Sequence, residues 1–211
     1  FSIGTLSYAW AKLYRKSFLD SNKIEFGDYR YAEDKIYNYF CYIAGARYAF
    51  IDKKIYVYRR NEQSVSNTYR KDGDKDWMRI AQDLQDKIDS LNYEKKQYSQ
   101  DEIENYESIV AWTIYFAAFF DGKMEYEYST GKIRTVINLL KRYASYDLTK
   151  KYLKNPLRYT KKIPALSYKI MLGGFAFLMK CNMYLLLSLG IKLLVDCHID
   201  ERLSDTGRKE D

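Results

Sequence analysis

Apolar residues recur at two different spacings along the chain, and the change from one spacing to the other comes at about residue 70. Beyond that point Asp76 to Leu91, Glu102 to Phe120 and Lys132 to Tyr143 each repeat apolar residues at steps of three and four. That spacing places them on one face of a helix. The second of these segments is nearly apolar over its second half, as buried helices are. Residues 71–147 are therefore predicted to be a helical extension.

Residues 1–70 combine helical spacing with short stretches that are typical of strands. Two helices are predicted, a short one over Tyr14 to Leu19 and a longer one over Glu33 to Ala46, where Gly45 is placed to close the helix. Three short aromatic or β-branched stretches are predicted to be strands: Ser7 to Leu13, Tyr48 to Ile51 and Ile55 to Tyr58. This part is expected to be mixed α/β, with too few strands to form a sheet by itself.

The last part of the chain, residues 148–211, combines positive charge with long apolar runs. Between Leu148 and Val195 there are nine basic residues and no acidic one, and this stretch accounts for the whole net charge of +7. A basic patch alone is compatible with nucleic acid, but one that continues into an apolar run favours an anionic membrane surface. From Lys169 to Lys192 only Lys180 interrupts the uncharged residues. Two short interfacial helices are expected there, with a membrane span and a packed hairpin as the alternatives.

Composition excludes several classes of site. The single histidine, His198, excludes histidine-based triads and multi-histidine metal centres. The three cysteines (Cys41, Cys181 and Cys197) are too scattered for a disulfide framework, which favours a reducing cytoplasm. The chain starts at Phe1 without an initiator methionine or a signal-like run, so it is expected to be part of a longer protein.

Four groups of residues in the first third of the chain occur in an order and at a spacing that can be compared with a protein family. They are Trp10-Ala11-Lys12-Leu13-Tyr14, Ile24-Glu25-Phe26, Glu33-Asp34, and the run from Tyr58 to Ser66 that reads Y-R-R-N-E-Q-S-V-S. Together they resemble the acceptor-side half of family 2 glycosyltransferases of the GT-A fold, over residues 6–68. The resemblance implies an α/β fold class, a truncated GT-A-type fragment followed by a mostly α-helical region. It also implies inverting transfer from a nucleotide-sugar donor to a glycan or lipid-linked acceptor, as in bacterial cell-surface polysaccharide synthesis.

The resemblance assigns the catalytic base to Asp34, with Glu33 orienting the acceptor or Asp34 itself. Inverting transfer needs a carboxylate that removes the acceptor hydroxyl proton as its oxygen attacks the anomeric carbon. The first turn of the following helix suits such a group, because its free N–H groups and positive dipole end favour a negative charge. The alternative is that Glu33 and Asp34 simply favour the helix start, as acidic residues commonly do.

The remaining site residues follow from the same resemblance. Arg59, Arg60 and Ser64 are expected at the donor diphosphate, for which guanidinium groups are well suited, although the arginines alone would also fit a solvated strand end. Trp10 and Lys12 are candidates for shaping the acceptor pocket, although for Trp10 the favoured interpretation is packing in the core, since large aromatic residues on strands usually pack. The family also implies Mg²⁺ or Mn²⁺, with its main ligand in a nucleotide-binding half that would precede Phe1. No metal ligand is assigned to the present chain, because Asn61 stands where many relatives have a histidine.

The motif Asp72-Gly73-Asp74-Lys75-Asp76 resembles a metal loop but does not match one. A calcium loop needs glycine at its sixth position, where this chain has Trp77. The segment is therefore predicted to be a solvated turn and helix cap.

The sequence as a whole predicts the C-terminal portion of an inverting glycosyltransferase, peripheral to the cytoplasmic face of the membrane and inactive without its donor-binding half. Its expected partners are the donor, the acceptor and anionic lipid, and no nucleic acid. The alternative is a non-catalytic helical module, at a membrane surface or on nucleic acid, that keeps a remnant of the transferase motif.

Overall fold

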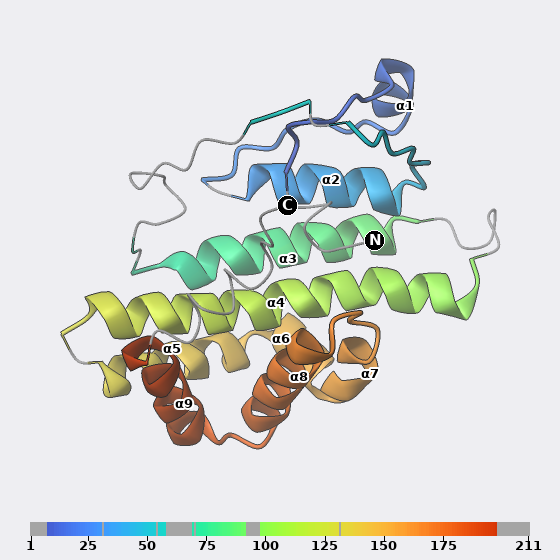
Figure 1. The fold of residues 1–211 in the computed structure, drawn as a ribbon. Coiled ribbons are helices and arrows are strands. Elements are labelled where there is room, and N and C mark those ends of the chain that lie inside the picture. The colour runs from blue at the N-terminus through green and yellow to red at the C-terminus, as the bar shows by residue number, and fades with distance from the viewer. Residues whose placement is uncertain are drawn as a thin grey trace. The chain divides into compact units, whose positions relative to one another are not determined.

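A computed structural model describes residues 8–30, 32–53, 55–57, 69, 71–91, 98–130 and 132–197. These residues form helices and no strand (Figure 1). The helices are α1 (Lys16–Ser21), α2 (Glu33–Ile43), α3 (Gly73–Asp89), α4 (Gln100–Tyr128), α5 (Ile133–Ser145), α6 (Asp147–Leu153), α7 (Pro156–Thr160), α8 (Leu166–Lys180) and α9 (Tyr184–Asp196). None of the described helices is both long enough and apolar enough to cross a membrane.

The α/β fold class predicted from the sequence is wrong for the described residues. Two of the expected strands, at Tyr48 to Ile51 and over residues 55–57, are irregular chain, and Tyr58 lies outside the described residues. The described part of the third contains a turn, in which Ala11 has a positive φ of 56°. Short alternating segments become strands only when neighbouring strands pair with them. The described chain provides no such neighbour, and side chains such as Val57 remain 93% exposed.

The predicted helices are confirmed, and the ends of some follow from local chemistry. Helix α2 ends in a Schellman motif, in which Gly45 has a φ of 83° and the N–H of Ala46 bonds to the carbonyl of Cys41. Asn182 has the same role after α8, with a φ of 58°. Helix α4 starts with a capping box, because Ser99 and Glu102 exchange hydrogen bonds between side chain and backbone.

The chain divides into two compact units. Unit 1 contains residues 1–68 and 82–106, and unit 2 contains residues 69–81 and 107–211, so that α3 and α4 contribute to both. The core of unit 1 is built around Ile24, Tyr37 and Cys41, with α1 and α2 side chains packed against it.

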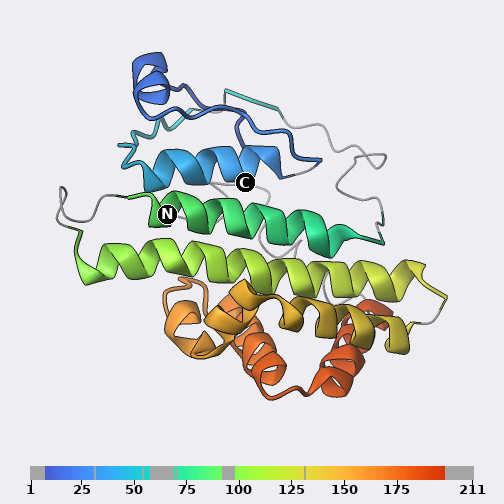
Figure 2. The same cartoon turned by 180° about the vertical axis from the view of Figure 1, so that it is seen from behind.

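Unit 2 is organised around the second part of α4. Helix α9 packs against α5, and α8 packs against α6 and α7. Figures 1 and 2 show α5 to α9 on one side of α4. Tyrosines connect these layers: Tyr115 is fully buried and donates to the carbonyl of Tyr152 at 2.9 Å. Tyr115 thus supplies both apolar area and a hydrogen bond across a helix interface.

Candidate functional site

The acceptor-side residues expected from the sequence all lie in unit 1. Asp34 is half-buried in the first turn of α2, and Glu33 beside it is exposed. The segment from Tyr8 to Tyr14 lies against this turn. Its Tyr14 hydroxyl donates to Oδ1 of Asn38 at 2.9 Å, and Nδ2 of Asn38 donates to the backbone carbonyl of Asp34 at 2.7 Å. Two segments about twenty residues apart in sequence are therefore joined through the backbone of the candidate base.

Lys12 extends this connection to the charge of Asp34. Its Nζ donates to the carbonyl of Tyr8, which holds the side chain back along the segment. Partial burial lowers the pKa of Lys12, while the nearby carboxylate of Asp34 opposes that shift. The charges of Lys12 and Asp34 therefore interact, and Asp34 lies in the first turn of α2.

Trp10 forms the centre of a stack of three aromatic rings. Its ring centroid is 4.8 Å from that of Tyr8 and 4.7 Å from that of Tyr56, with interplanar angles of 26° and 17°. The two tyrosines are about half exposed. Both faces of the Trp10 ring are therefore packed, as a packing role for Trp10 requires. The outer faces of Tyr8 and Tyr56 are the ones that a ligand can reach.

Lys35 is a further basic group at this end of α2 that the sequence did not single out. Burial lowers its pKa to about 8, although its neighbours in the sequence include the acidic Glu33 and Asp34. A lysine on an amphipathic helix carries no sequence signal for such a shift, because the shift comes from the packing around its side chain.

The three residues expected at the donor diphosphate, Arg59, Arg60 and Ser64, lie outside the described residues, as does Asn61. Among the residues that the structure describes, no group of three His, Cys, Asp or Glu side chains is placed to hold a metal ion. The described part of unit 1 therefore identifies no ligand for the divalent metal that the resemblance implies, and no step through a metal is derived from it.

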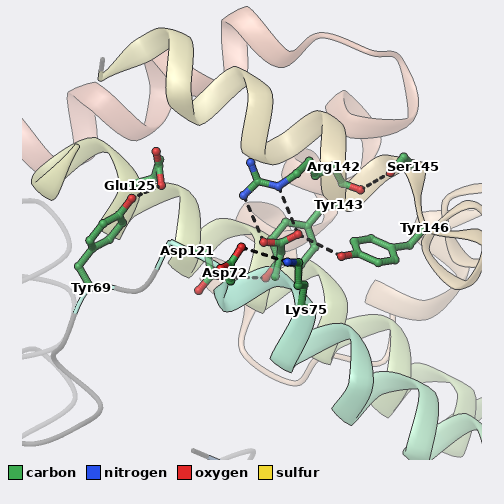
Figure 3. Close-up of polar contacts among 10 residues, drawn as sticks. Tyr69, Asp72, Lys75, Asp121, Glu125, Arg142, Tyr143, Ser145 and Tyr146 are labelled. Atoms are coloured by element: carbon green, nitrogen blue, oxygen red, sulfur yellow. Dashed lines mark hydrogen bonds and ion pairs between the residues drawn. The ribbon is translucent and has the colours of Figure 1, made fainter. Parts of the chain in front are cut away.

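A second polar cluster, in unit 2, was not expected from the sequence (Figure 3). Asp74, in the first turn of α3, is only 1% exposed. Its two oxygens accept hydrogen bonds from Nε and Nη2 of Arg142 at 3.3 and 3.2 Å, and Oδ2 also accepts from the hydroxyl of Tyr146 at 3.1 Å. The prediction of a solvated turn is therefore wrong for Asp74, while Asp72 does remain exposed and pairs with Lys75 at 3.3 Å.

Asp121, on α4, belongs to the same cluster. Its Oδ2 accepts from the hydroxyl of Tyr143 at 2.6 Å, and the side chain of Trp77 also donates to it. Burial raises the pKa of Asp121 to about 7, against the opposing effect of these hydrogen bonds, and the charges of Asp74 and Asp76 raise it further.

The unit 2 cluster is built like a structural network. Its carboxylates are satisfied by side chains from α3 and α5, and Gly73 sits so close to Asp121 that an added Cβ would be 2.9 Å from Oδ2. Such closely packed and internally bonded groups leave little room for a substrate. We therefore place the candidate functional site at the end of α2 in unit 1.

No family model, no curated protein and no solved structure matches this chain.

Proposed function

We propose that unit 1 is the acceptor-binding part of an inverting glycosyltransferase, with Asp34 as its general base. The observation that carries this proposal is the hydrogen-bonded connection from Tyr14 through Asn38 to the backbone of Asp34. The segment that ends at Tyr14 also contains Lys12 and Trp10, the centre of the Tyr8–Trp10–Tyr56 stack. Trp10, Lys12 and Asp34 are residues that the sequence resemblance names without using any contact between them. A polar, charged group next to half-exposed aromatic rings is the combination that a sugar needs, because its C–H faces pack on rings while its hydroxyls need hydrogen bonds.

In the proposed reaction the acceptor lies against the outer faces of Tyr8 and Tyr56 with one hydroxyl directed to Asp34. The carboxylate takes the proton of that hydroxyl while the hydroxyl oxygen of the acceptor forms a bond to the anomeric carbon of the donor. The bond from that carbon to the diphosphate oxygen breaks, and the diphosphate leaves with the electron pair. Asp34 lies in the first turn of α2, at the positive end of the helix dipole.

The donor site is not assigned to any described residue. A nucleotide-sugar-binding domain would have to act together with this chain, and the described chain alone is expected neither to bind a nucleotide sugar tightly nor to transfer sugar. The proposed role of this chain is therefore to bind the acceptor and to remove the proton from its hydroxyl group.

Replacing Asp34 by asparagine tests the assignment of the base. Asp34→Asn keeps the size of the side chain but cannot take the proton, so turnover should fall by about 10² to 10⁴-fold. The assay is sugar transfer by a preparation that joins this chain to a nucleotide-sugar-binding domain. Asp20→Asn is the matched control, because Asp20 is an exposed partner of Lys16 on α1 and should leave turnover within about twofold.

The alternative role of Asp34, favouring the helix start, predicts a different result. Loss of that effect would cost about 1 kcal/mol of stability and leave turnover nearly normal. A folded Asp34→Asn protein that keeps more than about a tenth of the original turnover would show that Asp34 is not the base.

A further inference from the structure

The outer sides of α8 and α9 are apolar where a helix in water is normally polar. Seven side chains there are between 46% and 68% exposed: Leu166, Ile170, Phe177, Leu185, Leu186, Leu189 and Leu193. We call this set the α8–α9 apolar face. The opposite sides of the two helices are buried in unit 2, through residues such as Phe175, Met179 and Ile191.

The positions of these residues follow helical spacing, so that each helix presents one continuous apolar stripe. On α8 the stripe runs through Leu166, Ile170 and Phe177, and on α9 through Leu185, Leu189 and Leu193. Gly174 and Gly190 lie in open space, where an added Cβ would meet no atom within 4 Å. Figures 1 and 2 show the α8–α9 hairpin at the edge of unit 2, with its turn directed away from α4.

Basic residues predominate around this face. Lys180 is exposed at the end of the α8 stripe, and Lys169 and Lys192 lie within the same two helices. No acidic residue occurs between Leu148 and Val195, and the first one after it, Asp196, pairs with Lys192. An apolar surface bordered by lysines complements a layer that is apolar inside and negatively charged outside.

The lengths of the helices decide how they can meet such a layer. Helices α8 and α9 have 15 and 13 residues, and at about 1.5 Å per residue each is shorter than the hydrocarbon core of about 30 Å. Their inner sides are also committed to the core of unit 2. Helices of this kind lie in the plane of the interface, with the apolar side toward the acyl chains and lysines reaching the headgroups.

We propose that the α8–α9 apolar face docks the chain on an anionic lipid bilayer, with both helices parallel to the membrane plane. The inference does not rest on the proposed transferase function. A chain that binds vesicles and no oligosaccharide would support the membrane inference and count against the function.

Vesicle co-sedimentation with the whole chain tests the proposal. The chain should bind mixed phosphatidylcholine–phosphatidylglycerol vesicles more strongly than phosphatidylcholine vesicles, and high salt should weaken that binding because it screens the headgroup charge. The double variant Leu186→Ser with Leu189→Ser should lower partitioning by at least about tenfold, since full burial of one leucine is worth about one to two powers of ten. Leu13→Ser is the matched control, because Leu13 is a 99% exposed leucine of unit 1, and it should change nothing.

A second pair of substitutions tests the attraction between the lysines and the anionic headgroups. Lys169→Glu with Lys180→Glu should lower partitioning onto the anionic vesicles by about fivefold or more for each charge changed. Partitioning onto the neutral vesicles should stay nearly constant. Circular dichroism checks that both double variants keep the helix content of the original chain.

The native cysteines provide a direct probe of the docked geometry. Cys181, in the turn between α8 and α9, is exposed, whereas Cys41 is buried. A polarity-sensitive fluorophore on Cys181, in a Cys197→Ser background, should report an apolar environment when anionic vesicles are added.

Three results would overturn the proposal. Equal binding to neutral and anionic vesicles at all salt concentrations would remove the role of charge. A dimer that the leucine variants dissociate, without vesicle binding, would make a second copy of the chain the occupant. Binding to RNA but not to vesicles, unchanged by the leucine variants, would make the surface a nucleic-acid site.

Discussion

Aspartate side chains in this protein differ in burial and in pKa because their surroundings differ. Asp72 and Asp74 are two residues apart in the chain, yet Asp72 lies in solvent and Asp74 is buried against Arg142. Asp121, near Asp74, has its pKa raised to about 7 mainly by burial. The difference between these side chains comes from tertiary partners on α4, α5 and the α5–α6 junction, and no local pattern in the sequence predicts it.

The raised pKa of Asp121 predicts a dependence of stability on pH. A carboxyl whose pKa is higher in the folded state binds its proton more tightly there, so the folded state is favoured at low pH and loses this advantage as the pH rises toward 7. Asp121→Asn should remove this loss of folding stability with rising pH, because asparagine does not titrate. The variant should therefore gain unfolding free energy relative to the original chain as the pH rises, by at most about 1.4 kcal/mol per pH unit.

Urea unfolding followed by tryptophan fluorescence, from about pH 5 to about pH 8, measures this difference over the range in which the carboxyl titrates. Asp72→Asn is the control, since Asp72 belongs to the same segment and is exposed. A difference between Asp121→Asn and the original chain that stays constant with pH would contradict the account of Asp121.

At the scale of elements, two adjacent glycines lie on different sides of α8, one exposed and one packed against α7. Gly174 faces open space, whereas an added Cβ at Gly173 would lie 3.1 Å from Oγ1 of Thr160 on α7. Gly174→Ala should raise the unfolding free energy by about 0.5–1 kcal/mol, because alanine is the better helix former. Gly173→Ala gains the same preference but must displace Thr160, an overpacking that costs about 1–3 kcal/mol.

Urea unfolding of the two variants therefore gives opposite results if α8 packs on α7 as described. Gly174→Ala should be more stable than the original chain, and Gly173→Ala less stable. Equal shifts in the two unfolding midpoints would show that the side of α8 bearing Gly173 does not contact α7.

Elements differ in how far the sequence predicts them. The helices from α2 onward with strong three- and four-residue spacing were predicted, since each one buries a stripe that its own sequence encodes. The predicted strands were wrong, because a strand depends on neighbours that its own residues do not specify. Residues 55–57 illustrate this, because Ile55, Tyr56 and Val57 are typical strand residues and yet all three side chains are at least half exposed.

The candidate site was predicted in part. The order of Trp10, Lys12 and Asp34 along the chain led to the expectation that they share a site, and that expectation remains a prediction. The role of Asn38 in joining Tyr14 to the backbone of Asp34 was missed. An asparagine inside a helix gives no sequence signal, because its contribution depends on which hydroxyl approaches it.

At the scale of the whole molecule, the two units carry different candidate surfaces. Unit 1 contains the aromatic stack and Asp34, and unit 2 contains the buried carboxylate cluster and the α8–α9 apolar face. The positive charge of the chain is concentrated between Leu148 and Val195, within unit 2. Sugar binding and lipid binding are therefore expected to respond to different substitutions.

The three tryptophans allow the proposed acceptor site in unit 1 to be tested directly. Trp10 lies in the stack of unit 1, whereas Trp77 and Trp112 lie in unit 2, where Trp112 donates its indole N–H to the carbonyl of Tyr159 at 2.9 Å. Each indole N–H gives its own signal in a proton–nitrogen NMR spectrum. The measurement is a titration of the chain with a panel of oligosaccharides from bacterial surface polysaccharides.

The account predicts that at least one oligosaccharide shifts the Trp10 signal in a saturable way and leaves the signals of Trp77 and Trp112 in place. Tyr56→Ala, which removes one outer ring of the stack, should weaken that binding by about tenfold, in line with the loss of one aromatic contact. Tyr168→Ala, a half-exposed tyrosine of α8, should not. If no oligosaccharide moves the Trp10 signal, or if Tyr56→Ala leaves the titration unchanged, unit 1 is not an acceptor site.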